Sequence, residues 1–281
     1  MVTTREGLVE QLKSGGPWRI AGSGVHRPFA SKGESLGQED ITILGMGALV
    51  AHDMADHVVV AEAGMRLREL QAHLQPTGQM LPYAPLFPEL AEATLGGLVS
   101  MNLPHLAEDR AGSWSDWVLG MTFLRPDGTV ARSGSRAVKS VAGYDVHHLA
   151  IGARGTLGII VEVILRTATV KVWNPAPPVP IPACPWIQRV RLGDYAAAVA
   201  EYPGAVIAQL PGSGLIVADV PAGQTRRRWP GDWVMRGGCG AQNFTWDDPV
   251  AARLFRAMRA VMDPDGRLNA DALPQLAGEL A

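Results

Sequence analysis

The sequence has little cysteine, little net charge and no long apolar run, and each shortage excludes a class of protein. Its two cysteines, Cys184 and Cys239, form neither a CxxC pair nor a Cys/His cluster. Reduced thiols are therefore expected rather than a disulfide framework or a zinc site. No apolar stretch approaches the roughly 20 residues that span a bilayer. The formal net charge of −2 offers no basic excess for binding nucleic acid.

Signals for export and common nucleotide-binding motifs are missing as well. Residues 1–16 carry charges and lack the apolar core of a signal peptide, so we expect a cytoplasmic protein that does not insert into a membrane. Gly22-Ser23-Gly24 lacks the third glycine of a Rossmann fingerprint. A Walker A sequence is absent too, which excludes a P-loop nucleotidase.

The composition predicts an ordinary folded chain. Of the 281 residues, 47% are hydrophobic and 19% are charged, enough to bury a core in one large domain or two modest ones. The 32 glycines and 21 prolines predict many turns or close approaches of backbone to a ligand.

Hydrophobic periodicity and turn residues predict mixed helices and strands. Leu67, Leu70 and Leu74 mark one face of a helix, and Pro126-Asp127-Gly128 marks the turn of a hairpin between strands at 118–124 and 129–132. Further helices are expected at 8–13, 98–101, 146–151, 195–202 and 249–262, further strands at 18–20, 41–44, 57–61, 156–163, 187–192, 205–210 and 214–220, an extended loop at 81–88, and a basic turn at 226–228. The expected fold class is α+β.

Three glycine clusters at the ends of predicted strands are candidates for binding an anion. They lie at residues 21–24, 94–97 and 152–158. Glycine lets backbone N–H groups converge on a phosphate because it has no Cβ, and serine and threonine hydroxyls add donors. Each cluster alone is more often a plain turn, but three in one domain favour a pyrophosphate cradle.

The order of these segments resembles that of one flavoprotein superfamily. Residues 19–24 resemble its pyrophosphate loop, residues 58–70 the following strand and helix, and residues 92–97 its second FAD-contacting loop. Residues 139–145 followed by 155–160 are similar to the FAD-binding subunit of bacterial glycolate oxidase. The chain therefore resembles FAD-binding proteins of the vanillyl-alcohol oxidase and p-cresol methylhydroxylase (PCMH) type.

This resemblance implies a domain organisation. A two-subdomain PCMH-type FAD-binding domain would occupy residues 1–172, and a small, reduced α+β cap residues 173–246. The C-terminal helix and tail, residues 247–281, would return to the FAD domain. The main boundary is the segment at 174–185, which contains six prolines and would be a rigid linker or a docking edge.

The resemblance also implies which residues contact FAD. The first loop would contact the pyrophosphate, the second would hold the flavin and ribityl side, and the third would complete the site. In that order the residues are Gly22, Ser23, Gly24, Val25 and His26; Thr94, Leu95, Gly96 and Gly97; and Gly143, Tyr144, Gly155, Thr156, Gly158 and Ile160. Asp116 and Val118 match a recurring Asp-x-Val, for which a structural and a functional role stay open.

The histidines suggest neither covalent flavin nor a metal. Some superfamily members attach flavin through a histidine that directly follows the glycine pair. Here Val25 separates Gly24 from His26, so non-covalent FAD is expected. His147 and His148 are adjacent on a predicted helix, where side chains point about 100° apart and rarely chelate together.

No catalytic residue is assigned. Relatives that oxidise 2-hydroxy acids place histidines, a metal site and an arginine in the cap and C-terminal half, whereas all seven histidines here lie in the first 148 residues. Hydride removal needs a nearby base for the hydroxyl proton. The only candidate types are Tyr195, Tyr202, Asp219 and Arg236. None of them belongs to a motif, and core or surface roles are expected for all four.

Three hypotheses about function follow. The resemblance favours an FAD-binding, electron-transferring or accessory subunit of a glycolate (2-hydroxy-acid) oxidase complex, with a catalytic flavoprotein and an iron–sulfur subunit as partners. The second hypothesis is a self-sufficient small FAD-dependent oxidoreductase. The third is a structural subunit that has lost its flavin. The sequence leaves the substrate, electron acceptor and oligomeric state open.

Overall fold

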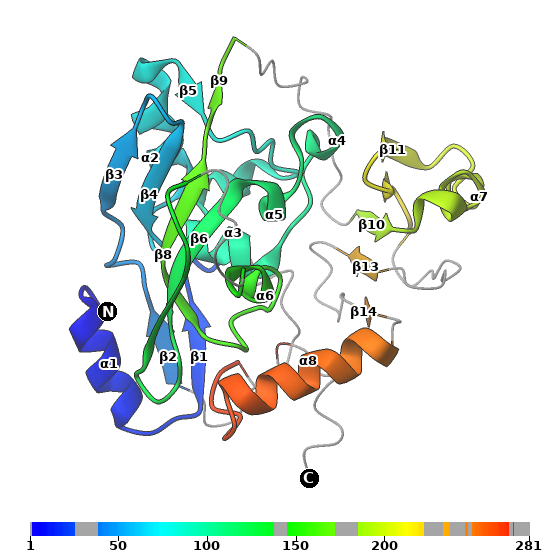
Figure 1. The fold of residues 1–281 in the computed structure, drawn as a ribbon. Coiled ribbons are helices and arrows are strands. Elements are labelled where there is room, and N and C mark those ends of the chain that lie inside the picture. The colour runs from blue at the N-terminus through cyan, green and yellow to red at the C-terminus, as the bar shows by residue number, and fades with distance from the viewer. Residues whose placement is uncertain are drawn as a thin grey trace.

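The computed structural model describes residues 2–25, 39–137, 145–171, 185–221, 233–236, 245–246, 249–269 and 272 of the chain. Helices and sheets are mixed along the chain, which confirms the α+β class. A larger N-terminal part surrounds one five-stranded sheet, and a smaller part surrounds a second one. The long helix α8 runs beneath both parts in Figure 1.

The sheet of the N-terminal part is antiparallel, and its three central strands are mostly buried while its two edge strands are half-exposed. The central strands are rich in apolar residues, many of them β-branched, which suits a buried sheet. Its strand order is β3-β4-β8-β6-β7. Strand β8 lies at its centre, pairing with β4 on one side and β6 on the other. The strands are β3 (Leu49–Asp53), β4 (Val58–Glu62), β6 (Val118–Leu124), β7 (Val130–Gly134) and β8 (Ile159–Arg166).

The predicted hairpin and the first predicted amphipathic helix are both confirmed. In the β6–β7 turn, Gly128 has φ +82° and Asp127 accepts a hydrogen bond from Thr129 N at 2.8 Å. This backbone hydrogen bond also lowers the pKa of the Asp127 carboxyl. Helix α2 (Leu67–Leu74) buries Leu67, Leu70 and Leu74, as the spacing predicts. It continues into a short 3₁₀ turn at Gln75–Thr77 and ends at Gly78.

Two two-stranded sheets, one parallel and one antiparallel, complete the larger part. Strand β1 (Trp18–Ala21) pairs in parallel with β2 (Glu39–Thr42), and β5 (Gln79–Met80) pairs with β9 (Ala168–Thr169). The prediction of a strand at 41–44 is wrong at both ends, because the chain turns at Ile43, whose carbonyl accepts a hydrogen bond from Met46 N.

Short helices connect these strands. They are α1 (Arg5–Lys13), α3 (Leu95–Met101), α4 (Glu108–Ala111), α5 (Trp114–Trp117), α6 (His147–Ala150) and the 3₁₀ helix η3 (Pro88–Glu92). Helix α6 is shorter than the predicted helix at 146–151. No helix among the described residues is long and apolar enough to cross a bilayer.

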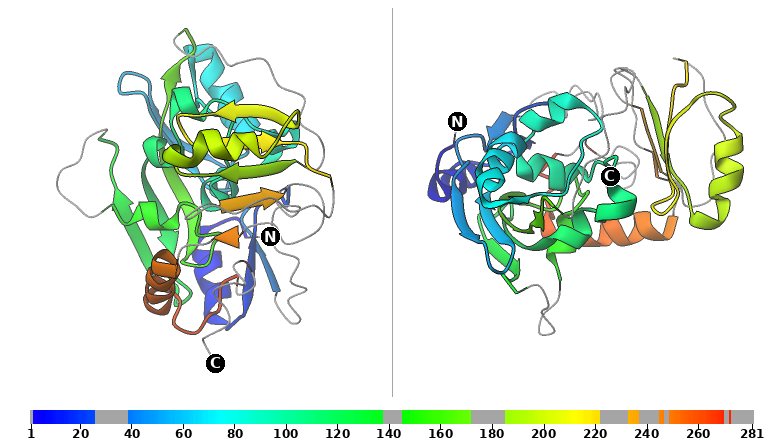
Figure 2. Two further views of the ribbon diagram at one scale, coloured as in Figure 1. Left: turned by 90° about the vertical axis from the view of Figure 1, so that its right-hand side faces the viewer. Right: turned by 90° about the horizontal axis from the view of Figure 1, so that it is seen from above.

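The smaller part is a sheet with one helix on its outer face (Figure 2). Its strand order is β11-β12-β10-β13-β14. The predicted strand–helix–strand–strand order is confirmed, although β10 is shorter than predicted and the last two strands were not foreseen. The elements are β10 (Trp186–Arg189), η4 (Leu192–Asp194), α7 (Tyr195–Ala200), β11 (Val206–Leu210), β12 (Leu215–Ala218), β13 (Trp233–Arg236) and β14 (Thr245–Trp246).

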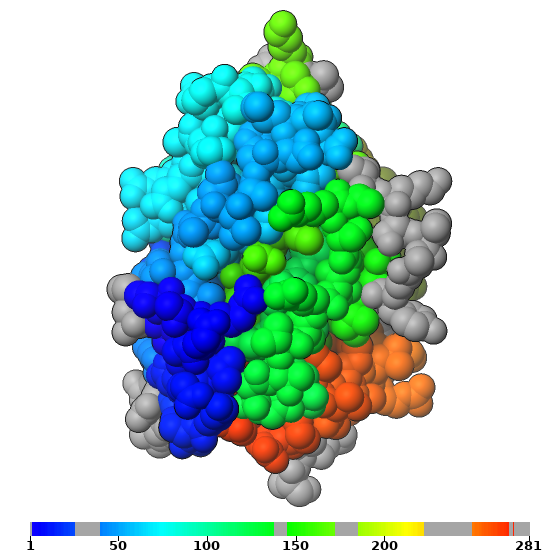
Figure 3. All heavy atoms as spheres, turned by 60° about the vertical axis from the view of Figure 1, so that its left-hand side comes forward, coloured from blue at the N-terminus to red at the C-terminus, as the bar shows by residue number. Residues whose placement is uncertain are grey.

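Helix α8 (Pro249–Met262) begins at the predicted proline and ends before Asp263. Its Phe255 packs against Ala153 and Leu157 of the larger part. On the face shown in Figure 3, α1, the β6–β7 hairpin and the end of α8 lie side by side. The hydrogen bonds agree, because Arg125 of the hairpin donates to the carbonyl of Val261 at 3.0 Å.

Candidate functional site

The fold brings the described parts of the three glycine clusters together. Residues 22–25 follow β1, residues 94–97 start α3, and residues 155–160 lead into β8. The predicted contacts His26, Gly143 and Tyr144 lie outside the described residues, as do Cys184, Cys239, residues 174–184 of the proline-rich segment and the basic turn at 226–228.

Contact between the first two clusters requires glycine at residue 22. A Cβ on Gly22 would lie 2.2 Å from Thr94 Oγ1, far inside normal contact. Thr94 is fully buried and caps α3, its Oγ1 accepting a hydrogen bond from Gly97 N at 3.2 Å. The backbone of the first loop therefore contacts the Thr94 side chain at the start of α3, and a side chain at residue 22 would not fit between them.

Besides Gly97, two further residues of the second cluster use their backbone N–H groups in hydrogen bonds within the fold. Leu95 N donates to Met65 O, and Gly96 N donates to Ala63 O, both at 2.8 Å. A Cβ on Gly96 would lie 2.9 Å from the Ala63 Cβ. Leu95 and Gly96 thus pack α3 against the segment after β4, and their N–H groups do not point to a free site.

The third cluster docks on the far end of α3. Gly152 N and Arg154 N donate to the carbonyls of Val99 and Ser100, at 3.1 and 2.8 Å. Gly155 has φ +71°, a conformation that favours glycine.

The prediction of a strand starting at Thr156 is wrong, because Thr156 closes this turn instead. Both its hydroxyl and its N–H donate to Ala153 O, at 2.6 and 3.0 Å. The strand starts three residues later, after Gly158, and Ile160 is buried in it opposite Phe123.

The first loop has the features that an anionic ligand needs. The Ser23 hydroxyl is buried and has no hydrogen-bond partner among the described residues. An unsatisfied buried hydroxyl costs about 1–3 kcal/mol unless something supplies a partner. Gly24 follows with φ +79°, so the loop presents a buried hydroxyl beside a left-handed glycine, and a phosphate oxygen could accept a hydrogen bond from that hydroxyl.

Asp116, whose role stayed open, makes structural contacts. Its carboxylate accepts hydrogen bonds from Ser113 N at 2.7 Å and Ser113 Oγ at 2.9 Å, which forms a capping box on α5. Val118 is buried at the start of β6. The Asp-x-Val sequence therefore joins α5 to the central sheet.

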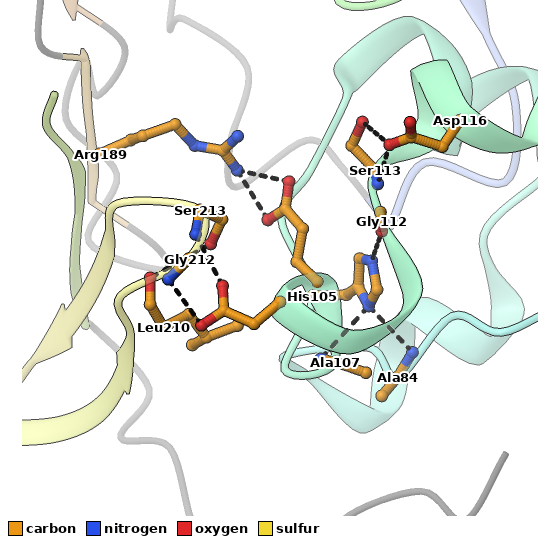
Figure 4. A network of polar contacts seen from close by, with 12 residues as sticks. Ala84, His105, Ala107, Gly112, Ser113, Asp116, Arg189, Leu210, Gly212 and Ser213 are labelled. Atoms are coloured by element: carbon orange, nitrogen blue, oxygen red, sulfur yellow. Dashed lines mark hydrogen bonds and ion pairs between the residues drawn. The ribbon is translucent and has the colours of Figure 1, made fainter. Parts of the chain in front are cut away.

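A buried junction between the two parts was missed from the sequence. Arg189 of β10 donates to both carboxylate oxygens of Glu108 at 2.7 Å (Figure 4). Next to it, the Asp109 carboxylate accepts from Gly212 N at 2.9 Å and Ser213 N at 2.7 Å. Two consecutive acids of α4 thus hold the smaller sheet, and burial raises the pKa of Glu108 despite the opposing effect of Arg189.

His105 lies beside this junction as a buried, neutral histidine. Its Nε2 lies 2.8 Å from Gly112 O, and its Nδ1 accepts from Ala107 N at 3.3 Å. These partners require a proton on Nε2 and none on Nδ1. Burial lowers the pKa of His105 to about 4, and the nearby Arg189 adds to this effect. Its ring packs against Tyr83 and Trp117, with centroids 5.1 and 4.9 Å apart.

The residues considered as candidate catalytic groups hydrogen-bond to neighbours within the smaller part. Tyr202 is buried and donates to Gln188 Oε1, and Tyr195 donates to Leu215 O at 3.3 Å. Asp219 is exposed, and its backbone N–H donates to Ala205 O at 2.8 Å. The side chain of Arg236 lies outside the described residues. Tyr202 thus lies in the core of the smaller part, Tyr195 is partly buried and Asp219 lies at the surface.

His147 and His148 differ from each other. His147 is buried and lies 3.0 Å from Ser133 Oγ, while His148 is exposed. Burial lowers the pKa of His147. Among the described residues no group of three or more His, Cys, Asp or Glu side chains is arranged to hold a metal ion.

Comparison with known proteins shows what the larger part is similar to. Residues 12–134 match the family model of the FAD binding domain. The chain is similar to glycolate oxidase subunit GlcE of Escherichia coli, with 36% identity over 119 residues, or 42% of this chain and 33% of that protein. It is 35% identical to the mitochondrial D-lactate dehydrogenase [cytochrome] of Arabidopsis thaliana over 43% of this chain and 21% of that protein.

The chain is also similar over a longer stretch to D-2-hydroxyglutarate dehydrogenase of Xanthomonas citri, with 29% identity over 60% of this chain and 33% of that protein. The chain thus matches a third or less of the length of these relatives. A solved alkyldihydroxyacetonephosphate synthase superposes with a TM-score of 0.49 and 19% identity, covering 69% of this chain and 36% of the synthase.

Proposed function

Because residues 12–134 match the family model of the FAD binding domain, we propose that the chain is a PCMH-type FAD-binding subunit of a 2-hydroxy-acid oxidase complex, with glycolate as the substrate. The similarity to a glycolate oxidase subunit and to two dehydrogenases of 2-hydroxy acids supports this assignment. The observation that carries the FAD part is the contact of Gly22 with Thr94 beside the Ser23 hydroxyl, which has no hydrogen-bond partner in the part of the chain that the structure describes.

The proposed FAD contacts come from the three glycine clusters. Gly22, Ser23, Gly24 and Val25 would hold the pyrophosphate non-covalently, with His26 following. Thr94 and Gly97 would flank the flavin and ribityl side, with Leu95 and Gly96 packing α3 behind them. Gly143, Tyr144, Gly155, Thr156, Gly158 and Ile160 would complete the site. Bound FAD supplies an acceptor for two electrons, which no amino-acid side chain provides.

The chain's own residues support an accessory or electron-transferring role. Oxidation of a 2-hydroxy acid needs a base near the substrate hydroxyl. Among the described residues, His105 and His147 are buried within the fold and the tyrosines of the smaller part bond to their neighbours. We therefore propose that a catalytic flavoprotein and an iron–sulfur subunit complete a cytoplasmic complex. Residues 173–246 would act as a reduced cap, and residues 247–281 would return to an FAD domain at 1–172.

Steady-state turnover tests the accessory role. The purified full chain, loaded with FAD, is expected to reduce a dye with glycolate at no more than background rate. Addition of a catalytic flavoprotein and an iron–sulfur subunit of a glycolate oxidase should restore turnover. Normal turnover by the chain alone would support a self-sufficient oxidoreductase instead, and a chain that takes up no FAD would support a structural subunit.

A further inference from the structure

The segment after α8 runs beside the strand that leads into the first glycine loop. Trp18 N donates to Arg267 O at 2.6 Å, and Asn269 N donates to Trp18 O at 2.9 Å. A parallel bridge joins Trp18 to Leu268. The chain near residue 269 therefore reaches the base of the loop that contains Gly22.

One side chain of this segment joins two of the glycine clusters. Asn269 Oδ1 accepts a hydrogen bond from Ile20 N at 2.7 Å, and Asn269 Nδ2 donates to Arg154 O at 2.7 Å. Ile20 lies two residues before Gly22, and Arg154 directly precedes Gly155. An amide matches this position because it has one acceptor and one donor end, as the N–H and the C=O it bridges require.

The surroundings of Asn269 leave it little freedom. The residue is 8% exposed and has φ +40°, a conformation that asparagine tolerates better than most residues. A Cβ on Gly155 would lie 2.5 Å from Asn269 Nδ2. Glycine at 155 thus makes room for the amide, and the amide in turn fixes the position of the carbonyl before that glycine.

We infer that Asn269 is a positioning residue of the cofactor site: its amide holds the first glycine loop and the turn before β8 in the relative position that FAD binding requires. The inference rests on the proposed function, since it assigns Asn269 to the FAD site proposed above. It makes the segment after α8 a part of that site although Asn269 itself need not touch the cofactor.

A separate set of contacts anchors the same segment and provides a control. The Asp263 carboxylate accepts from Arg267 N and Leu268 N, both at 2.9 Å. The Arg267 guanidinium donates to Pro126 O at 3.1 Å and Gly15 O at 3.2 Å, and also to Leu12 O. These acceptors belong to the β6–β7 turn and the end of α1, not to the glycine clusters.

The first test compares two variants of the full chain by FAD titration and thermal unfolding. Asn269→Ala removes both side-chain hydrogen bonds, and we expect the Kd for FAD to rise about tenfold. Arg267→Ala, which disturbs the same segment from its other side, should lower the melting temperature but change that Kd by less than about twofold. An unchanged Kd for Asn269→Ala, or equal weakening by both variants, would overturn the inference.

A conservative variant separates positioning from general destabilisation. In Asn269→Asp one oxygen can still accept from Ile20 N, but the other faces Arg154 O and repels it unless the carboxyl is protonated. Its Kd for FAD should therefore fall as the pH is lowered, while the Kd of the unchanged protein stays level. A ratio of the two Kd values that does not move with pH would contradict the assigned hydrogen bonds.

Hydrogen exchange distinguishes failure of this inference from failure of the proposed function. In the chain without FAD, Asn269→Ala should speed exchange of the Ile20 amide and of the loop at 22–25, whereas Arg267→Ala should not. If the unchanged protein bound no FAD, the proposed function would fail, and slow exchange in Asn269→Ala would independently overturn the inference.

Discussion

The glycine-cluster site and the junction between the two sheets are built from different chemistry. The glycine-cluster site (residues 22–25, 94–97 and 155–160) consists of backbone amides, hydroxyls and glycines that let segments approach within contact distance. The junction consists of two carboxylates, a guanidinium and two backbone amides, and a buried neutral histidine lies beside it. Steric fit holds the glycine-cluster site together, whereas charged groups hold the junction together.

The difference teaches how each region should respond to change. A cradle of neutral groups is sensitive to one added methyl group and insensitive to pH. A buried ion pair is sensitive to loss of a partner and to protonation. Perturbations that act on only one of the two regions therefore test whether the FAD site and the sheet junction are independent.

The largest expected effect is the loss of stability in acid that comes from His105. Its pKa is about 4 in the folded protein and 6.5 in the unfolded chain, so the unfolded state binds the extra proton between these values. The contribution of neutral His105 to the free energy of unfolding is fully present above pH 6.5 and is lost as the pH drops toward 4, by about 3 kcal/mol in total. Denaturant unfolding at a series of pH values across this range should show this fall in the free energy of unfolding.

The control for this prediction is a histidine outside the junction. His105→Gln removes the titrating ring and should reduce the slope, leaving the contribution of His147, whose pKa is also lowered by burial, although it lowers stability at neutral pH. His148→Gln, on an exposed residue, should leave the slope in place. If His105→Gln kept the full slope, other groups would be responsible, and the assignment of the acid sensitivity to His105 would be wrong.

The second prediction concerns the shape of the glycine-cluster site. Gly22→Ala would place a Cβ 2.2 Å from Thr94 Oγ1, so the loop must move and the Kd for FAD should rise about 100-fold, or ~2.7 kcal/mol. Gly193→Ala is the matched control, since nothing lies within 4 Å of its Cβ position. Adding Thr94→Ala to Gly22→Ala should recover part of the affinity, and an unchanged Kd for the single variant would refute the contact.

The third prediction breaks the ion pair of the junction. Arg189→Ala leaves the Glu108 carboxylate buried without its guanidinium partner, and we expect a loss of about 2 kcal/mol in the free energy of unfolding. The value is below that of a fully buried pair because the arginine side chain is 27% exposed. Arg191→Ala, on an exposed neighbour, should cost far less, and FAD affinity should not change with either variant.

The smallest expected effect concerns Asp109. Asp109→Asn replaces a charged acceptor of two backbone N–H groups by a neutral one, with an expected loss of about 1 kcal/mol in the free energy of unfolding. Asp56→Asn, on an exposed turn, serves as the control. Equal effects of the two variants would show that the Gly212–Ser213 turn does not depend on the carboxylate.

Local chemistry explains which parts of the molecule the sequence could predict. The β6–β7 hairpin depends on Asp127 and Gly128 within a few residues, and α2 depends on leucines three and four apart, so both were predictable. The glycine clusters could be located for the same reason. Strand β14 was missed because two residues are too few to show a periodicity.

Contacts between distant residues could not be predicted in this way. Glu108 and Arg189 are 81 residues apart, and Ile20 and Asn269 are 249 apart. Neither pair has a local pattern, and only the three-dimensional arrangement of the strands brings the partners together. The same holds for His105, which in the sequence is a lone histidine and in the fold is a buried neutral group beside an ion pair.

The central claim is that the larger part of the chain holds FAD without a covalent bond, and the visible absorption spectrum tests it most directly. The purified protein, incubated with FAD and freed of excess by gel filtration, should show the absorption bands of oxidised flavin. Acid precipitation should release these bands into the supernatant. A colourless protein after incubation with FAD would contradict the account, and yellow colour that stays with the precipitate would contradict the non-covalent attachment.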